Sequence, residues 1–135
     1  MTRLRLSDLT PEQRERIKAV ARIDHEPRRM NKTEARRADA LEAMKRGCFI
    51  HDYRFEAMKL RLADGTFFTP DFLVIGTAGE VELEDVKGRK GDGYYSTEDA
   101  RLKVKIAADQ YPWFRFYVAW EDRRGNWCRK EVRPA

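Results

Sequence analysis

The sequence predicts an α/β (α+β) fold, in which a mixed β-sheet is flanked by helices. Apolar residues recur at helical spacing twice before residue 47 and again between residues 96 and 110. The segments between and after these alternate with the period of two that is typical of β-strands. The resulting order is helix, helix, three strands, helix, strand, strand. A chain of 135 residues suits one domain with a single hydrophobic core.

The first helix is predicted to start at Thr10, which can cap it, with Gln13 at the capping-box position. Pro27 ends this segment or leaves it as a linker, because the residue before a proline disfavours helical backbone. Residues 1–30 are therefore predicted to form a basic N-terminal helical extension, and residues 31–135 the main domain. The apolar stripe of the first helix consists of Ile17, Val20, Ala21 and Ile23.

The second helix is predicted from about Thr33 to Arg46, where Gly47 stops it. Glu34 lies at the start of this helix and has two interpretations. It falls on the same stripe as the apolar residues, so its carboxylate would point inward. It also lies three residues after Asn31, where it could serve only as a capping-box partner. The inner stripe consists of Ala38, Leu41 and either Met44 or Cys48.

The middle of the chain is predicted to form an antiparallel meander of three strands. The first strand begins at Phe49, and a slip in its alternation near residues 56–57 indicates a bulge or bend. An Asp-Gly turn at residues 64–65 leads into a return strand over residues 67–75. Residues 80–87 form the third strand.

The C-terminal part predicts a glycine-rich basic loop over residues 88–95, a helix and two further strands. Ser96 or Thr97 caps the helix, which reaches about Gln110. Residues 114–120 alternate as one strand, and the last strand lies around residues 127–132. The inward positions of the helix are Ala100, Val104, Ala107 and Ala108.

Positive charge is concentrated at the N-terminus. Residues 1–37 hold 11 Lys/Arg and 6 Asp/Glu, whereas the remaining residues hold 17 of each, so the whole net charge of +5 lies in the first segment. A basic segment beside a balanced domain indicates a polyanionic partner such as DNA. A solvated charged helix explains the same pattern.

The composition excludes several classes of site. Only two cysteines and two histidines are present, which argues against a disulfide framework, a zinc site and any multi-histidine centre. The glycine-rich loop lacks the Gly-Lys-Ser/Thr ending of a phosphate-binding P-loop, and we expect no organic cofactor. No apolar run resembles a signal peptide or a membrane span, so a cytoplasmic protein without a membrane partner is expected.

Three residues carry the predicted chemistry. Asp85 and Lys87 share one face of the third strand, and Asp71 lies in the neighbouring strand directly after a proline that indicates a bend. Two converging carboxylates repel each other, and a hard divalent cation relieves that repulsion. We therefore expect Mg²⁺ or Mn²⁺ bound by Asp71 and Asp85, with the carbonyl of Val86 as a further ligand and Glu34 binding directly or through water.

Lys87 has two predicted tasks: it can orient or help to deprotonate the attacking water, or stabilise charge in the transition state. Two other acids are candidates for the site. The alternation places Glu84 on the opposite strand face, as a solvent or salt-bridge residue. Glu56 can support the site or be an ordinary strand residue, and the pattern favours the latter.

Substrate contacts are predicted from basic and aromatic residues near the site, because arginine and lysine contact phosphates and tyrosine rings stack on unpaired bases. Lys103 is the best candidate on the helix after the loop. The N-terminal helix could clamp DNA or form a homodimer through Ile17 and Val20. The predicted nucleic-acid contacts are Arg28, Arg29, Arg89, Lys90, Tyr94, Tyr95, Arg101, Lys103 and Lys105.

Taken together, these motifs resemble the PD-(D/E)XK nuclease superfamily, and within it a phage-associated family of small proteins. The strings that carry the resemblance are NKTE (31–34), YRFE (53–56), LRLADGTFFTPDF (60–72), EDVKG (84–88) and KVKIAADQYP (103–112). The resemblance covers roughly residues 31–120 and implies a restriction-endonuclease-like core. It further implies metal ligands Asp71 and Asp85, catalytic Lys87 and supporting Glu34. Asp85 stands where glutamate is commoner, which leaves the metal preference open.

The expected function is a Mg²⁺-dependent DNA endonuclease, acting on branched or otherwise structured DNA in phage recombination or packaging. A phage-encoded protein of this kind would work in the host cytoplasm. Two alternatives stand beside it. One is a non-catalytic nucleic-acid-binding protein that keeps the nuclease fold, and the other is a phage protein-interaction module.

Overall fold

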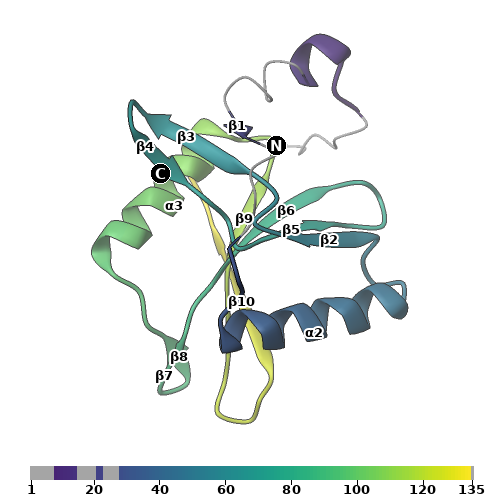
Figure 1. The fold of residues 1–135 in the computed structure, drawn as a ribbon, viewed down its shortest axis with the longest axis vertical. Helices are drawn as coiled ribbons and strands as arrows, with labels where there is room; N and C mark the ends of the chain where they lie inside the picture. The colour runs from purple at the N-terminus through teal and green to yellow at the C-terminus, as the bar shows by residue number, and fades with distance from the viewer. Residues whose placement is uncertain (1–7, 15–20, 23–27, 135) are drawn as a thin grey trace.

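A five-stranded mixed sheet forms the centre of the molecule (Figure 1). The computed structural model describes residues 8–14, 21–22 and 28–134. The strand order is β10-β9-β6-β5-β2. The strands are β2 (Asp52–Phe55), β5 (Phe72–Ile75), β6 (Val81–Val86), β9 (Arg115–Glu121) and β10 (Trp127–Val132). All neighbouring pairs are antiparallel except β6 and β9, which run parallel. The predicted α+β class with a mixed sheet is confirmed.

Two helices cover opposite faces of this sheet. Helix α2 (Lys32–Arg46) starts at Asn31, whose side chain and Glu34 form a capping box, and ends at Gly47. Helix α3 (Glu98–Gln110) connects β6 to the parallel β9 and is capped by Thr97. Both starts match the sequence prediction, because each cap satisfies a backbone donor that the helix itself leaves free.

Each helix has its own hydrophobic cluster. On one face, Val104 and Ala107 of α3 pack with Leu83 and Phe116 of the sheet. On the other face, the fully buried Leu41 of α2 packs with Ile50, Phe72 and Val74. The alternation of β6 therefore divides its residues between two interiors, with Leu83 towards α3 and Val86 towards α2.

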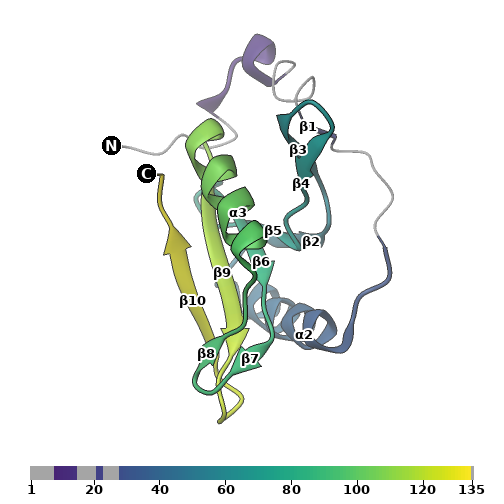
Figure 2. The ribbon, with the colours of Figure 1, turned by 90° about the vertical axis from the view of Figure 1, so that its left-hand side faces the viewer.

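A smaller sheet of three strands has the order β1-β3-β4, from β1 (Ala21–Arg22), β3 (Lys59–Ala63) and β4 (Thr66–Phe68). Both views show it above β2, β5 and β6, with α2 below them (Figures 1 and 2). The first two strands of the predicted meander are thus each divided between two sheets. The divisions fall at Glu56, which has a left-handed φ of 45°, and at Pro70, where a ladder donor is missing.

Three further predictions are corrected. Ala21 and Arg22 pair with β3 as a strand, so the helix that starts at Thr10 does not extend through them. The strand predicted to begin at Phe49 begins instead at Asp52, as β2, and the Phe49 side chain is 76% exposed. The predicted loop over residues 88–95 contains a hairpin, β7 (Arg89–Lys90) with β8 (Gly93–Tyr94).

The N-terminal segment contacts the rest of the domain at the points that the structure describes. Thr10 and Gln13 form the predicted capping box, and Leu9 is buried in the cluster beneath α3. Ile17, Val20 and Ile23, on which the predicted helix stripe and dimer contact depend, lie outside the described residues. In the described part of the chain, no helix combines the length and apolar character needed to cross a membrane.

Candidate active site

The bends in the two long strands place three carboxylates in a row. Phe72 of β5 lies opposite Glu84 of β6, and continuing this register by one residue sets Asp71 opposite Asp85. On the other side of β5, the register of β2 continues in the same way from Phe55 to Glu56. The Glu56 amide donates to the Asp71 carbonyl at 2.8 Å, and the Asp71 amide donates to the Glu84 carbonyl at 2.8 Å.

Asp71 is the buried centre of this row. Its Oδ2 accepts a hydrogen bond of 2.7 Å from the backbone N–H of Val86, which anchors the carboxylate between β5 and β6. Burial and the neighbouring charge of Asp85 raise the pKa of Asp71 to about 9, against the opposing effect of the Val86 N–H. Ionising Asp71 beside Asp85 is therefore costly in the protein alone.

Asp85 and Lys87 lie side by side, as the strand alternation predicted. The Lys87 Nζ is 2.9 Å from Asp85 Oδ2, and the Lys87 amide donates to the Ala119 carbonyl of β9 at 2.9 Å. Lys87 therefore follows directly after the end of β6, with its backbone fixed by the parallel strand beside it.

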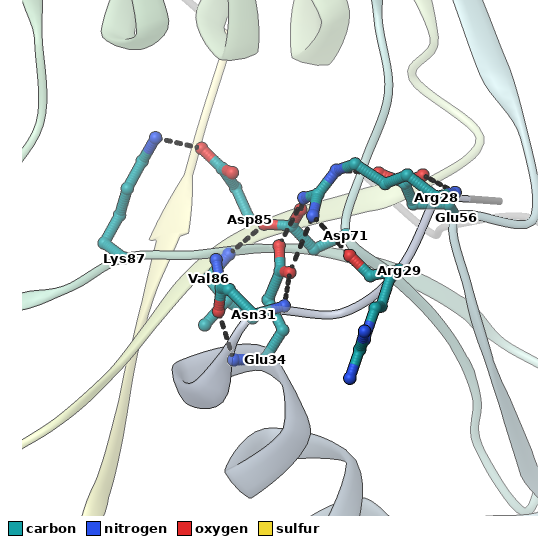
Figure 3. Close-up of polar contacts among 9 residues, drawn as sticks. All are labelled: Arg28, Arg29, Asn31, Glu34, Glu56, Asp71, Asp85, Val86 and Lys87. Carbon is teal, nitrogen blue, oxygen red and sulfur yellow. Dashed lines mark hydrogen bonds and ion pairs between the residues drawn. The ribbon is translucent and has the colours of Figure 1, made fainter.

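Glu34 fulfils both interpretations that the sequence left open. It closes the capping box, because its Oε1 accepts from the Asn31 amide at 2.9 Å while the Asn31 side chain accepts from the Glu34 amide at 2.8 Å. It is also buried, and its carboxylate points towards the strand carboxylates (Figure 3). Burial opposes its ionisation, but hydrogen bonds from Arg28 and Asn31 hold the pKa of Glu34 below its ordinary value.

Arg28 lies among these acids (Figure 3). Its Nη2 is 2.5 Å from Glu34 Oε2 and 3.4 Å from Asp71 Oδ1, and its Nε is 3.0 Å from Glu56 Oε2. The sequence predicted Arg28 as a nucleic-acid contact, and the structure places its guanidinium on carboxylates instead. Hydrogen bonding to Glu34 raises the pKa of Arg28 further above its already high value. The side chain of Arg29 points away from the cluster (Figure 3).

Glu56 is the residue that sequence reasoning missed. The pattern favours an ordinary strand residue over a residue that supports the site, whereas Glu56 is buried at the end of the carboxylate row and accepts a hydrogen bond of 3.1 Å from the Arg28 amide. Its signal in the sequence was the slip of the alternation at this position. The chain bends at Glu56, where it leaves the five-stranded sheet. At this bend Glu56 lies beside Asp71, which directly follows the division at Pro70 in the neighbouring strand.

Glu84 belongs to a separate network on the α2 face. It is fully buried and accepts from Arg37 Nε at 2.8 Å and Arg37 Nη2 at 2.6 Å, with Arg129 Nε at 3.0 Å. The prediction that Glu84 lies on the other face of the strand from Asp85 and forms a salt bridge is confirmed. The alternative, a solvent-exposed Glu84, is wrong. This network joins α2 to β6 and β10 of the sheet.

The predicted substrate contacts are distributed over several surfaces. Tyr94 packs on Trp120 with ring centroids 4.8 Å apart, which holds the β7–β8 hairpin against β9. Tyr95 is exposed, and Lys90 Nζ lies 5.6 Å from its ring centroid. Lys103 pairs with Asp99 of its own helix at 3.4 Å. Three of the remaining predicted residues, Arg29, Arg101 and Lys105, are exposed.

A pocket of about 260 Å³ is lined in part by Lys87, the residue that also pairs with Asp85. Basic side chains from three elements line it: Arg36 of α2, Arg89 of β7 and Arg123 of the turn before β10, beside Lys87 itself. Arg89 was predicted to contact substrate, whereas Arg36 and Arg123 were not singled out. The other lining residues are Thr33, Glu121, Asp122 and Gly125.

The donor chemistry of the cluster fits a hard divalent cation. Within the described residues, no group of three or more His, Cys, Asp or Glu side chains is already arranged to hold a metal ion. Mg²⁺ requires less, because it usually takes one or two carboxylates and keeps several waters. Asp71 and Asp85 supply such a pair, and the raised pKa of Asp71 marks the charge that a cation would stabilise. For Val86, the contact seen is its amide on Asp71.

Comparison with known proteins gave no match, whether against protein-family models, curated proteins or solved structures.

Proposed function

We propose that the protein is a metal-dependent nuclease of the PD-(D/E)XK type that hydrolyses phosphodiester bonds in DNA. The observation that carries the proposal is the pairing of Asp71 with Asp85 across two strands, with the Lys87 ammonium on Asp85. Two neighbouring carboxyl groups are costly to bury beside each other, and a site for a bound cation would account for their presence. The parallel β6–β9 pair with its α3 connection is compatible with a restriction-endonuclease-like core.

Asp71 and Asp85 would hold the cation, and Glu34 would bind it directly or through water. When bound, Mg²⁺ or Mn²⁺ would polarise the phosphate and lower the pKa of the attacking water. Asp71 is held in place by the Val86 amide, and Glu34 by its capping box, so both carboxylates are oriented before any ion arrives. Such prior orientation is what a catalytic site requires.

Lys87 supplies the positive charge at the edge of the cluster. Its Nζ is 2.9 Å from Asp85 Oδ2, and Lys87 is also one of the residues that line the basic pocket. From this position the lysine can donate to a non-bridging phosphate oxygen or orient the attacking water, the two tasks that its place in the sequence predicts. In both tasks Lys87 acts at the reacting phosphate, either on its oxygen or on the water that attacks it.

The pocket gives a path for the substrate strand. Arg36, Arg89 and Arg123 surround it, and arginine binds phosphate oxygens in a bidentate manner. A phosphate seated there would place the next phosphate of the same strand near Lys87. The proposal therefore favours a polynucleotide substrate and internal cleavage, with branched DNA as the first form to test.

A cleavage panel tests the proposal. Single-stranded, duplex, flapped and four-way DNA, and RNA, are incubated with the purified protein in Mg²⁺, in Mn²⁺ and in EDTA. We expect metal-dependent cleavage of a DNA form, and a loss of about 100-fold or more in Lys87→Ala with DNA binding retained. Lys59→Ala is the matched control, because Lys59 lies over Phe67 in the small sheet. Absence of cleavage of every nucleic acid under all metal conditions would refute the proposal.

A second candidate is a non-catalytic nucleic-acid-binding protein with the same fold. One observation favours it: Arg28 already provides a cation to three of the acids. This candidate predicts salt-dependent DNA binding that Asp71→Asn and Lys87→Ala leave unchanged, without cleavage.

A further inference from the structure

The carboxylate cluster contains a cation of its own. Arg28 contacts acids from three separate places in the fold: Glu34 at the start of α2, Glu56 after β2 and Asp71 before β5. Its backbone N–H also binds Glu56, at 3.1 Å. Asp85, the fourth acid, is paired with Lys87 instead. Two basic residues thus divide the four carboxylates between them.

The contacts of Arg28 differ in strength in a way that matters for exchange. The bond to Glu34 is bidentate, with Nη1 at 2.9 Å from Oε1 and Nη2 at 2.5 Å from Oε2. The contact with Asp71 is longer, at 3.4 Å. The Arg28 side chain is 51% exposed, whereas the side chains of its three partners are at most 10% exposed. The guanidinium can therefore return to water while the carboxylates stay buried.

A divalent ion and this guanidinium compete for the same oxygens. Asp71 belongs to the proposed metal pair and also contacts Arg28, and Glu34, the proposed further ligand, is the acid that Arg28 binds through both carboxylate oxygens. A cation of charge +2 held on Asp71 would repel a guanidinium a few ångströms away, and the interior of the cluster screens that repulsion poorly. Simultaneous binding of the divalent ion and the Arg28 guanidinium to Asp71 is therefore unfavourable.

We propose that Arg28 is the resident cation of the carboxylate cluster, and that a divalent metal binds by displacing its guanidinium from Asp71 and Glu34. The inference rests on the proposed function, which supplies the metal site. In the metal-free protein Arg28 keeps the acids assembled and supplies the positive charge that Glu34 and Glu56 bind. In the metal-bound protein it swings to solvent, so the strength of its ion pairs sets the metal affinity.

Metal affinity, measured without any substrate, tests this exchange. The full chain and its Arg28→Ala, Arg28→Gln and Arg29→Ala variants are titrated with Mn²⁺ by calorimetry. We expect Arg28→Ala and Arg28→Gln to bind Mn²⁺ roughly tenfold more tightly, the size of effect expected when partly exposed ion pairs no longer compete. Arg29→Ala removes the same charge one residue away, from a side chain that points out of the cluster, and its affinity should change by less than about twofold.

Thermal unfolding gives a second readout. Without metal, Arg28→Ala should melt below the wild type because three buried acids lose their cation, and saturating Mn²⁺ should raise its melting temperature more than that of the wild type. If Arg28→Ala fails to fold, Arg28→Gln, which retains a donor for Glu34, carries the comparison. Equal or weaker Mn²⁺ binding in the Arg28 variants, with binding intact in the wild type, would overturn the displacement alone. No Mn²⁺ binding by any form would overturn the displacement and the proposed function together.

Discussion

Replacing Asp71 by asparagine should remove most of the pH dependence of stability in the metal-free protein. The pKa of Asp71 lies at about 9 in the folded chain because the carboxyl is buried and faces Asp85. In the unfolded chain it falls to roughly 3.9. Between these values the folded state keeps a proton that the unfolded state releases. The contribution of this group is therefore complete below about pH 4, declines as the pH rises, and is lost above about pH 9.

The size of the effect follows from the same shift. One pKa unit corresponds to about 1.4 kcal/mol, so a shift from 3.8 to about 9 amounts to several kcal/mol across this pH range. Asparagine carries no titrating proton but keeps an oxygen for the Val86 N–H, which Asp71 accepts at 2.7 Å. Asp71→Asn should thus match or exceed the wild-type stability at pH 8, where the wild type has lost part of this contribution.

Urea unfolding in EDTA, at intervals from pH 5 to pH 9, measures the two profiles. Asp64→Asn is the control, because Asp64 is exposed in the Asp-Gly turn and Asn-Gly preserves that turn. The control should follow the wild type, whereas the Asp71→Asn profile should be nearly flat over the same range. Parallel profiles for wild type and Asp71→Asn would refute the electrostatic description of the cluster.

Three further substitutions test other parts of the structure. Arg37→Ala should lower the free energy of unfolding by about 3–5 kcal/mol in chemical denaturation, because it leaves Glu84 buried with only Arg129 as its cation. Thr97→Ala should lower it by about 1 kcal/mol through loss of the α3 cap, with no effect on metal binding. Arg36→Ala combined with Arg123→Ala should raise the KM for DNA with kcat retained, and should reduce the salt slope of DNA binding by about one unit per residue. An unchanged salt slope would remove the pocket from the substrate path.

Local signals predicted α2, α3 and the last strand correctly. The Asn31–Glu34 capping box and Gly47 define α2 through hydrogen bonds made within a few residues, and Thr97 does the same for α3. Such contacts depend only on nearby sequence, which is why they can be identified without a structure. The alternation along β6 likewise placed Asp85 and Lys87 on one face.

The positions of Glu56 and Arg28 depended on contacts that no local pattern contains. The register that brings Glu56 opposite Asp71 includes an irregularity between Arg61 and Ala63 and the left-handed bend at Glu56 itself. Each irregularity moves the pairing, so counting back from the Asp64-Gly65 turn gives the wrong partner. Arg28 reaches Asp71 across 43 positions of sequence, a distance at which residue spacing carries no information.

The internal pairs also change the meaning of the charge distribution. The positive excess of residues 1–37 indicated a basic arm facing a polyanion, yet three of its arginines bind acids of the fold: Arg28 in the carboxylate cluster, Arg36 on Glu121 and Arg37 on Glu84. Their charge neutralises carboxylates that lie in the supposedly balanced part of the chain. A segment-by-segment count cannot detect this, because the partners of an ion pair are separated in sequence. Under the proposed function, the basic surface best placed to meet a nucleic acid is the pocket beside Lys87, which Arg89 and Arg123 line together with the Glu121-paired Arg36.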